Sequence, residues 1–513
     1  MTLSKREVRE RLFHGDRIAT DVDERADVVV IGSGPGGAAT ADLLGAAGLD
    51  VIVCEEGGWF DESDYNGSFP DMSRKLYRDS GGTIALGHPP IIIPLGRVVG
   101  GTAHINSGTC FRTPDHVLRN WALLHGVEAM SPEEMAPVFD EVERRLSVHE
   151  LPREILGQNA FIVERGAKAL GLNFRPLRHN GRDCKGCGTC TFGCVDGGKQ
   201  SPDAAYIPHF VGRGGRVYTR TRIERLLLRG RRAEGVEGRL CDALGQPTSR
   251  RFRVRAKLVV LAAGTISSPA FLLKNRVGLS SGEVGRNLTI HPAARVAALM
   301  DEEVRGWVGV PQGSYIDDFA KDGIMFEGIF VPPSVGAVTF PETGPALKNF
   351  MMNYSRMSMY GAMISDTSRG RVIYARKRPI MLYQMNRLDA ERMLRAAVIL
   401  CRIYAAAGAK RLYPKIGPMK EIGLNQIDEI ARRKPRASDF EMMAFHPLGT
   451  CRMGGDPSRS VVDSWGKVHD AEGLFVIDGS VMPSPLGVNP QITIFAFAHR
   501  AARHIAANFS RYA

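Results

Sequence analysis

The stretch that decides the fold begins Asp27-Val28-Val29-Val30-Ile31-Gly32-Ser33-Gly34-Pro35-Gly36-Gly37 and continues through a small-residue segment to Val51-Ile52-Val53-Cys54-Glu55. The apolar run before the glycines is short and β-branched, which is typical of a strand buried on both faces. The glycines have the G-x-G-x-x-G spacing at the point where such a strand turns into a helix. We therefore predict a strand, a helix and a second strand over residues 27–55.

Each glycine of this motif has its own physical task. Gly32 permits the tight turn, Gly34 lets a pyrophosphate approach the backbone, and Gly37 lets the helix pack closely on the strand. The start of the helix offers free N–H groups to phosphates. Glu55 ends the second strand at about the spacing of an acid that binds a ribose hydroxyl. The combination predicts a dinucleotide site, and a glycine-rich turn that binds nothing is the alternative.

Composition places the chain among ordinary globular proteins with more than one lobe. It has 513 residues, of which 44% are hydrophobic and 24% charged, and its formal net charge is +12. No basic run accompanies that charge, so we interpret it as solvated surface and expect no nucleic-acid partner. Residues 1–25 lack the apolar core of a signal peptide, and no stretch is apolar enough for a membrane span. We therefore expect a cytoplasmic protein.

Two further apolar segments resemble the first strand. Residues 258–264 and 473–478 each read as a buried strand, and we expect both to join residues 28–31 in one doubly wound sheet. Residues 56–95 read as an irregular excursion, whereas acids after Ser131 indicate a capped helix start. Methionines and tyrosines gather in residues 296–430, which we interpret as core filler in preference to a deformable apolar pocket.

Several motifs together resemble the glucose–methanol–choline (GMC) flavoprotein oxidoreductases, in family order from about residue 27 to residue 508. They are the glycine motif, Gly96-Arg97-Val98-Val99-Gly100-Gly101 with Asn106, Gly264-Thr265-Ile266-Ser267-Ser268-Pro269, Val284-Gly285-Arg286-Asn287-Leu288, and the run from His446-Pro447-Leu448-Gly449-Thr450-Cys451-Arg452-Met453-Gly454 to Asn489-Pro490. The cysteine-rich segment and Phe111-Arg112-Thr113-Pro114 are most similar to the long-chain alcohol oxidase and related bacterial branch. Two signatures depart from the family pattern, at Thr102-Ala103-His104 and at Asn275-Arg276-Val277-Gly278, without removing a catalytic group.

The resemblance implies an α/β fold, with a Rossmann-like FAD-binding domain and a discontinuous substrate-binding domain on a mostly antiparallel sheet. We expect five segments along the chain. They are 20–115 (first FAD-binding part), 116–199 (substrate or cap segment with the cysteines), 200–295 (second FAD-binding part), 296–439 (substrate-binding domain) and 440–513 (third FAD-binding part with the catalytic His and Asn).

The resemblance also implies which residues contact FAD. By family position Glu55 would bind the adenosine ribose, Ile223 would pass near the adenine, and Asp478 would lie near the pyrophosphate and ribityl chain. The remaining cofactor-binding residues are Gly32, Gly34, Gly37, Gly100, Gly101, Asn106, Gly264 and Asn489. Some relatives bind FAD covalently through a histidine near the position of His104, but this residue is one place off, so we favour noncovalent FAD.

His446 and Asn489 align with the catalytic pair of the family. Alcohol oxidation removes a hydroxyl proton and a hydride, and the hydride would pass to flavin N5. An unperturbed imidazole accepts a proton near neutrality, and an amide can donate a hydrogen bond to a developing alkoxide. We therefore predict His446 as the general base, Asn489 as the donor, and His291 and His499 as structural residues.

Cys184, Cys187, Cys190 and Cys194 have the C-x₂-C-x₂-C-x₃-C spacing of bacterial ferredoxin loops. The spacing favours an iron–sulfur cluster, whereas the resemblance favours reduced thiols that brace a loop. We keep both interpretations with the thiols slightly ahead, and zinc as a weaker third.

The functional hypothesis is oxidation of a primary or secondary alcohol, expected to be hydrophobic, by an FAD-dependent enzyme. The electron acceptor is left open among oxygen, a quinone and a protein. A cysteine-anchored electron-transfer or metal-binding module and a nonredox lyase of the same family are the alternatives.

Overall fold

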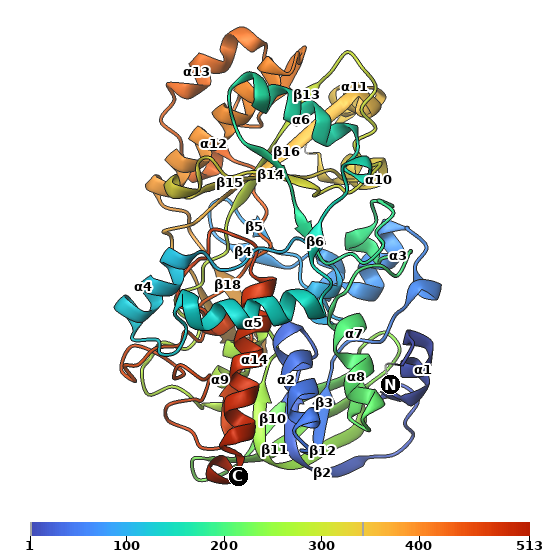
Figure 1. Ribbon diagram of the computed structural model, residues 1–513, viewed down its shortest axis with the longest axis vertical. Helices are drawn as coiled ribbons and strands as arrows, with labels where there is room; N and C mark the ends of the chain where they lie inside the picture. The colour runs from blue at the N-terminus through green and yellow to red at the C-terminus, as the bar shows by residue number, and fades with distance from the viewer. Residues whose placement is uncertain (1–2, 341–342) are drawn as a thin grey trace.

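The computed structural model describes residues 3–340 and 343–513 and arranges them in a lower and an upper lobe along its longest axis (Figure 1). The lower lobe is built on an eight-stranded sheet in the order β1-β9-β3-β2-β12-β11-β10, with β20 also paired to β12. Its strands are β1 (Phe13–His14), β2 (Val22–Ile31), β3 (Val51–Cys54), β9 (Arg216–Thr219), β10 (Thr221–Arg229), β11 (Arg232–Cys241), β12 (Pro247–Leu261) and β20 (Leu474–Val476).

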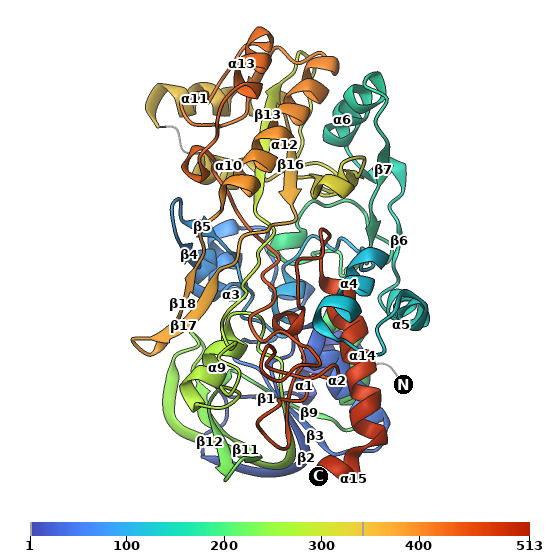
Figure 2. The ribbon, with the colours of Figure 1, turned by 90° about the vertical axis from the view of Figure 1, so that its left-hand side faces the viewer.

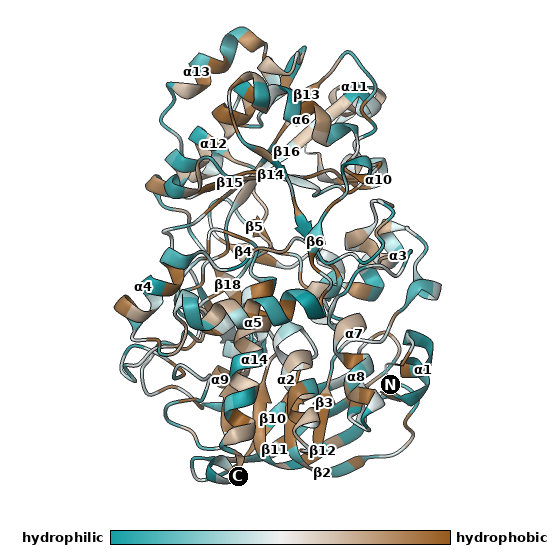
Figure 3. Ribbon diagram, in the orientation of Figure 1, coloured by the Kyte–Doolittle hydropathy of each residue, from teal (hydrophilic) through white to brown (hydrophobic). Residues whose placement is uncertain are grey.

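Register confirms the central expectation for this sheet. Val28 pairs in parallel with Val51 on one side and with Leu258 on the other. Val259 in turn pairs in parallel with Leu474. The three apolar segments therefore belong to one sheet, as a doubly wound core requires. These inner strands are the brown part of the lower lobe in Figure 3.

Two helices bring the N- and C-terminal parts of the chain together on this sheet. α2 (Pro35–Ala46) follows β2 directly and packs against α14 (Gln491–Ala507), and the two lie side by side in Figures 1 and 2. α14 also packs against α5 (Pro132–Arg145), which begins after Ser131. The Ser131 hydroxyl accepts a hydrogen bond from the N–H of Glu134, so the predicted capped start is confirmed.

The upper lobe has a six-stranded sheet in which every pairing is antiparallel, in the order β19-β13-β16-β15-β14-β7. The helices α6 (Gln158–Ala169) and α12 (Arg387–Ala406) pack against β16 and against each other. A mostly antiparallel second sheet was predicted and is confirmed. Its strands are β7 (Phe174–Pro176), β13 (Ala293–Leu299), β14 (Ser314–Ile316), β15 (Ile324–Gly328), β16 (Met357–Ile364) and β19 (Arg411–Tyr413).

Residues 56–95, expected to be irregular, contain α3 (Phe69–Leu76), β4 (Ile84–Leu86) and β5 (Ile91–Ile92). The two strands join β17 (Arg371–Ala375) and β18 (Arg378–Leu382) in a small sheet. This pairing partner lies far along the chain, so local sequence could not indicate it. The other α-helices are α1 (Lys5–Arg11), α4 (Asp115–His125), α7 (Pro202–Ala205), α8 (Ile207–Gly212), α9 (Ser267–Asn275), α10 (Pro333–Thr339), α11 (Gly344–Met352), α13 (Ile427–Ala431) and α15 (Phe509–Tyr512).

Segment 116–199 contributes to both lobes, because α5 packs on α14 whereas β7 is an edge strand of the upper sheet. The boundaries of the five segments stay a prediction. Among the described residues, no helix combines the length and the apolar character needed to cross a membrane.

Candidate active site

The turn between β2 and α2 is shaped by its glycines. Gly32 has φ +99°. A Cβ added to Gly37 would lie 1.9 Å from the Gly32 carbonyl oxygen, and one added to Gly36 would lie 1.8 Å from that of Ile477. The strand, the helix and the loop after β20 therefore approach one another too closely for any side chain at these positions. The N-cap of α2 is Gly34, and no side chain caps the helix there. Its first N–H groups are thus available to an anion such as a pyrophosphate.

Glu55 ties this turn to the end of β3. Its carboxylate accepts hydrogen bonds from the Ser33 N–H (3.0 Å), the Ser33 hydroxyl (2.7 Å) and the Gly57 N–H (2.7 Å). Burial raises the pKa of Glu55, although these hydrogen bonds oppose the shift. The Thr221 N–H donates to the Glu55 carbonyl, so β10, which carries Ile223, starts beside Glu55. Ile223 therefore follows, two residues later in β10, the residue that is bonded to Glu55.

A second loop crosses the glycine turn. Gly100 and Gly101 have φ +99° and +58°, and a Cβ on Gly101 would lie 3.0 Å from the Gly34 Cα. The Gly100 N–H donates to the Ser33 hydroxyl at 3.1 Å. Further along, the Asn106 amide donates to the Gln491 side chain at 2.9 Å, at the start of α14. The loop thus runs from the glycine turn after β2 to the start of α14, the helix that follows Asn489.

Asp478 follows β20 and binds the loop after β12. Its carboxylate accepts from the Gly264 N–H (2.9 Å), the Ser268 hydroxyl (2.5 Å) and the Ser480 N–H (2.8 Å). Burial raises its pKa despite these donors. Asp478 therefore joins the loop after β12 to the loop after β20. The glycine turn after β2, the loop of residues 100–106 and the loops after β12 and β20 thus contact one another around the uncapped start of α2, and we call these four segments the cradle. Their backbone fits a dinucleotide such as FAD.

The reacting pair lies where the two lobes meet. Asn489 Nδ2 is 3.3 Å from His446 Nε2, and the Met363 sulfur is 3.2 Å from His446 Nδ1. Asn489 immediately precedes the start of α14, and Met363 belongs to β16 of the upper sheet. These partners assign the hydrogen to Nδ1 and leave Nε2 as an acceptor. Burial lowers the pKa of His446 to about 4, although the ring stays partly exposed.

Glu327 is a third polar residue of the site that the sequence did not reveal. Asn489 Nδ2 donates to its Oε2 at 3.3 Å, and the Gln312 amide donates to the same oxygen. Burial raises the pKa of Glu327 to about 7. It lies in β15 within Ile324-Met325-Phe326-Glu327-Gly328, and an acid inside an otherwise apolar strand was the signal available.

The two histidines predicted to be structural have structural contacts. His291 Nε2 accepts the N–H groups of Leu486 (3.1 Å) and Gly487 (3.0 Å), which fixes the segment before Asn489. Its ring lies 5.5 Å from that of His446. His499, in α14, contacts the Tyr206 hydroxyl through Nε2 at 2.9 Å.

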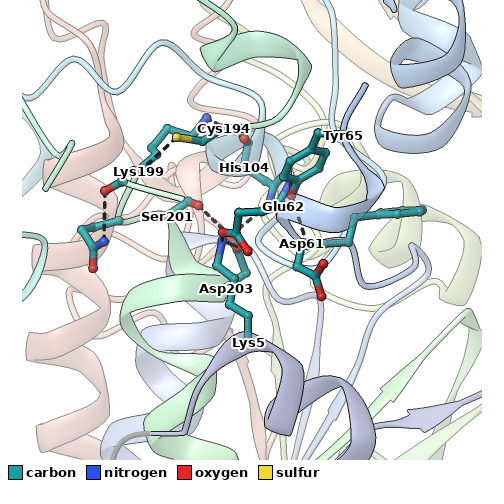
Figure 4. A network of polar contacts seen from close by, with 12 residues as sticks. Lys5, Asp61, Glu62, Tyr65, His104, Cys194, Lys199, Ser201 and Asp203 are labelled. Atoms are coloured by element: carbon teal, nitrogen blue, oxygen red, sulfur yellow. Dashed lines mark hydrogen bonds and ion pairs between the residues drawn. The ribbon is translucent and has the colours of Figure 1, made fainter. Parts of the chain in front are cut away.

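A polar network connects His104 to Tyr65, Lys199 and Asp203 (Figure 4). His104 is bonded at both ring nitrogens, to Asp203 at 3.0 Å and to the Tyr65 hydroxyl at 2.9 Å. The Lys199 ammonium is buried and donates to the carbonyls of His104 (2.6 Å), Asn106 (2.8 Å) and Cys190 (2.9 Å). Lys199 therefore joins the cysteine segment to the loop of residues 100–106.

The four cysteines line one small cavity together with Lys199. Within residues 3–340 and 343–513, no group of three or more His, Cys, Asp or Glu side chains is placed to hold a metal ion. Burial raises the pKa of the Cys190 thiol to about 12, and the thiols of Cys184 and Cys187 are shifted in the same direction. The iron–sulfur interpretation therefore gains no support here, and the interpretation as reduced thiols that brace a loop stays a prediction.

Comparison with known proteins agrees with these features. Two sequence profiles, both described as GMC oxidoreductase, match residues 73–293 and 366–498. An uncharacterised GMC-type oxidoreductase of Mycobacterium tuberculosis is 35% identical over 92% of this chain and 75% of its own length. A long-chain-alcohol oxidase of Arabidopsis thaliana is 29% identical over 93% of this chain and 66% of its own length. The FAD-containing formate oxidase of Aspergillus oryzae shares the fold, with a TM-score of 0.73, 15% identity and coverage of 96% of this chain and 100% of that one.

Proposed function

The chain belongs to the GMC oxidoreductase family and is an FAD-dependent oxidoreductase, and from this premise we propose that it oxidises a hydrophobic primary or secondary alcohol to the carbonyl compound. One observation carries the proposal: His446 Nε2 and Asn489 Nδ2 lie 3.3 Å apart. Asn106, in the loop of residues 100–106, contacts Gln491 two residues beyond Asn489, so the pair lies next to the cradle.

Bound FAD would supply the hydride acceptor for this reaction. His446 accepts the hydroxyl proton at Nε2, which is free of hydrogen because Nδ1 faces the sulfur of Met363. The Asn489 N–H that faces His446 Nε2 would turn to the oxygen as negative charge develops on it, while the other N–H stays with Glu327. His291 keeps Asn489 in place by binding the backbone of the preceding residues.

The cradle residues would hold FAD without a covalent bond. The N–H groups at the start of α2 would bind the pyrophosphate and Glu55 the adenosine ribose, with Ile223 near the adenine. His104 is the histidine nearest the position used for covalent attachment, and both its nitrogens are engaged by Asp203 and Tyr65. A ring held in this way is not free to attack a flavin carbon.

An apolar wall beside His446 supports a hydrophobic substrate. Met363 contacts the His446 ring and pairs in the sheet with Met325, and both side chains are buried. Most other methionines of residues 296–430, among them Met357 and Met359, lie in the core, as predicted. Met363 is therefore the methionine that we propose lines the substrate site. A relative named long-chain-alcohol oxidase agrees with this substrate class.

We infer that the cysteine segment braces the loop of residues 100–106 through Lys199 rather than serving a cluster. Electrons would then leave the flavin directly to oxygen, a quinone or a soluble protein. Mixing reduced enzyme with air or with a soluble quinone, and following the return of the flavin band, tests the first two acceptors, and no return with either points to a protein.

Anaerobic reduction of the purified protein by a panel of alcohols tests the proposal. We expect yellow protein whose flavin absorbance bleaches fastest with fatty or sterol-like alcohols. Faster bleaching by a hexose or choline would contradict the hydrophobic substrate. Yellow protein that no alcohol bleaches would favour a nonredox lyase, and colourless protein containing zinc would favour the metal-binding alternative.

A further inference from the structure

We infer that Glu327 is the electrostatic partner of His446, so that the His446–Glu327 pair holds the proton released by the alcohol. This inference deepens the proposed function and rests on it. Glu327 itself belongs to no family motif, and it meets His446 across one amide group, that of Asn489.

The geometry around Asn489 defines where a proton can reside. Asn489 Nδ2 has two hydrogens and two acceptors, Glu327 Oε2 and His446 Nε2, each at 3.3 Å. Glu327 Oε2 also accepts from Gln312. The second oxygen, Oε1, is buried and has no hydrogen-bond partner among the described residues. Because Oε2 is occupied by two donors, a proton on Glu327 belongs on Oε1.

Burial makes the two groups depend on each other. When His446 takes a proton it becomes a cation in a site that disfavours charge, as its lowered pKa shows. An ionised carboxylate one amide away offsets that cost by Coulomb attraction in a medium of low dielectric. Glu327, with a pKa raised to about 7, is ionised in a large fraction of molecules above neutrality. On this inference we expect the two groups to titrate as a pair.

The reaction balances with one proton on this pair. At the start His446 is neutral, Glu327 is ionised, and the alcohol has its O–H and C–H bonds. Both bonds break as the C=O bond forms: the hydrogen of the C–H bond leaves with two electrons to the flavin, and the O–H proton goes to the pair. The pair changes from one negative charge to none, whichever member carries the proton.

His291, whose ring lies 5.5 Å from that of His446, stays neutral because burial lowers its pKa. The other ionisable groups near it are held by partners of their own. Tyr360, from β16, shares a hydrogen bond with Ser314, and burial raises its pKa, so it stays neutral. The Asp366 carboxylate accepts hydrogen bonds from the Tyr383 hydroxyl and from the backbone N–H of His291. Arg369, which acts electrostatically on His291, donates to the backbone carbonyls of Asp366 and Ser368.

The test measures flavin reduction against pH under anaerobic conditions. In the wild-type protein we expect the rate to rise through about pH 7, where Glu327 ionises. Glu327→Gln keeps the side-chain shape and the two donors, Asn489 and Gln312. In this variant we expect the rise of the rate with pH to move towards the pKa of His446 alone, and the rate at high pH to fall at least about tenfold. Glu164→Gln is the matched control, because Glu164 is a buried acid in α6 that pairs with Arg153 instead. It leaves the wild-type profile unchanged.

A second variant protects the test against a failure of Glu327→Gln to fold. Gln312→Leu removes one donor to the ionised carboxylate, so the pKa of Glu327 increases and the rise of the rate moves to higher pH. An unchanged position of this rise in either folded variant would overturn the inference.

Infrared difference spectra supply a readout that needs no turnover. Wild-type minus Glu327→Gln spectra of the FAD-bound protein should show a protonated carboxyl band that disappears as the pH rises through about 7. Absence of any titrating band overturns the inference. Undiminished reduction in His446→Ala would instead overturn the proposed function, while the infrared band would still report on Glu327.

Discussion

His104 and His446 both lie in segments that carry family motifs, and their surroundings differ in one decisive respect. Asp203 and Tyr65 occupy both nitrogens of His104, which is 3% exposed. His446 is partly exposed, and its Nε2 faces only the amide of Asn489. A histidine with both nitrogens engaged adds rigidity, whereas one with an accessible acceptor nitrogen can exchange a proton with a ligand. The comparison shows why a histidine in a family loop need not be a reacting group.

The largest expected effect comes from removing the accessible histidine. His446→Ala should keep FAD and lower the single-turnover rate of flavin reduction by about 10²–10⁴-fold, because the hydroxyl proton loses its acceptor. Stopped-flow absorbance with a reactive alcohol measures the rate. Reduction at the wild-type rate would show that His446, like His104, does not accept the hydroxyl proton.

Glu55→Ala should act on the cofactor and leave the proton acceptor intact. The substitution leaves the Ser33 and Gly57 N–H groups without their acceptor, so the glycine turn loosens and FAD affinity falls about tenfold or more. Flavin content after gel filtration checks this, with His446→Ala as the comparison. Equal FAD content in the two variants would argue against a cofactor role for Glu55.

Asp203→Asn should lower the free energy of unfolding. Burial alone would raise the pKa of Asp203, but the charges of His104 and Lys5 and the hydrogen bonds around it hold the pKa below its usual range. The ionised Asp203 therefore stabilises the folded protein above about pH 4, and this stabilisation is lost as the pH falls below that value. We expect the variant to lose about 3 kcal/mol of unfolding free energy near neutrality and to show a weaker acid dependence.

Thermal unfolding between pH 3 and pH 8 measures both features of Asp203→Asn. The flavin reduction rate of the folded variant should change less than about tenfold, because His104 does not exchange protons with the substrate. Parallel pH curves for the variant and the wild type would show that the network around His104 contributes no such stability.

The smallest effect is expected at the cysteines. Cys187→Ser should leave FAD content and the reduction rate near wild-type values, and iron and sulfide should be absent from anaerobically purified protein. Cys187 lies in the segment that Lys199 joins to the loop beside His104, so it belongs to the structural side of the comparison. The opposite result would be stoichiometric iron and broad absorbance beyond the flavin bands, both lost in Cys187→Ser. That result would show that the four cysteines bind an iron–sulfur cluster.

Sequence was informative wherever local chemistry determines local structure. Gly32 and Gly37 lie at contacts that exclude a side chain, and Ser131 caps its helix, because these features depend on residues nearby in the chain. The three apolar strands could be assigned to one sheet from their composition. The pairing of β4 with β18 could not, because it joins segments about 300 residues apart that carry no shared motif.

The candidate site was predictable only in part for the same reason. His446 and Asn489 were found through family motifs, whereas Glu327 has no motif and gains its meaning from burial next to Asn489. The lowered pKa of His446 likewise comes from surroundings that several distant segments create. Cysteine spacing suggested a cluster, but spacing does not show whether four thiols converge on one metal.

The most direct test of the central claim is an anaerobic titration of FAD-bound protein with a fatty alcohol, in which both flavin bleaching and carbonyl product are quantified. We predict one molecule of aldehyde or ketone for each FAD bleached in the wild-type protein, and the same ratio reached far more slowly in His446→Ala. Bleaching without carbonyl product, or equal rates in the two proteins, would contradict the account.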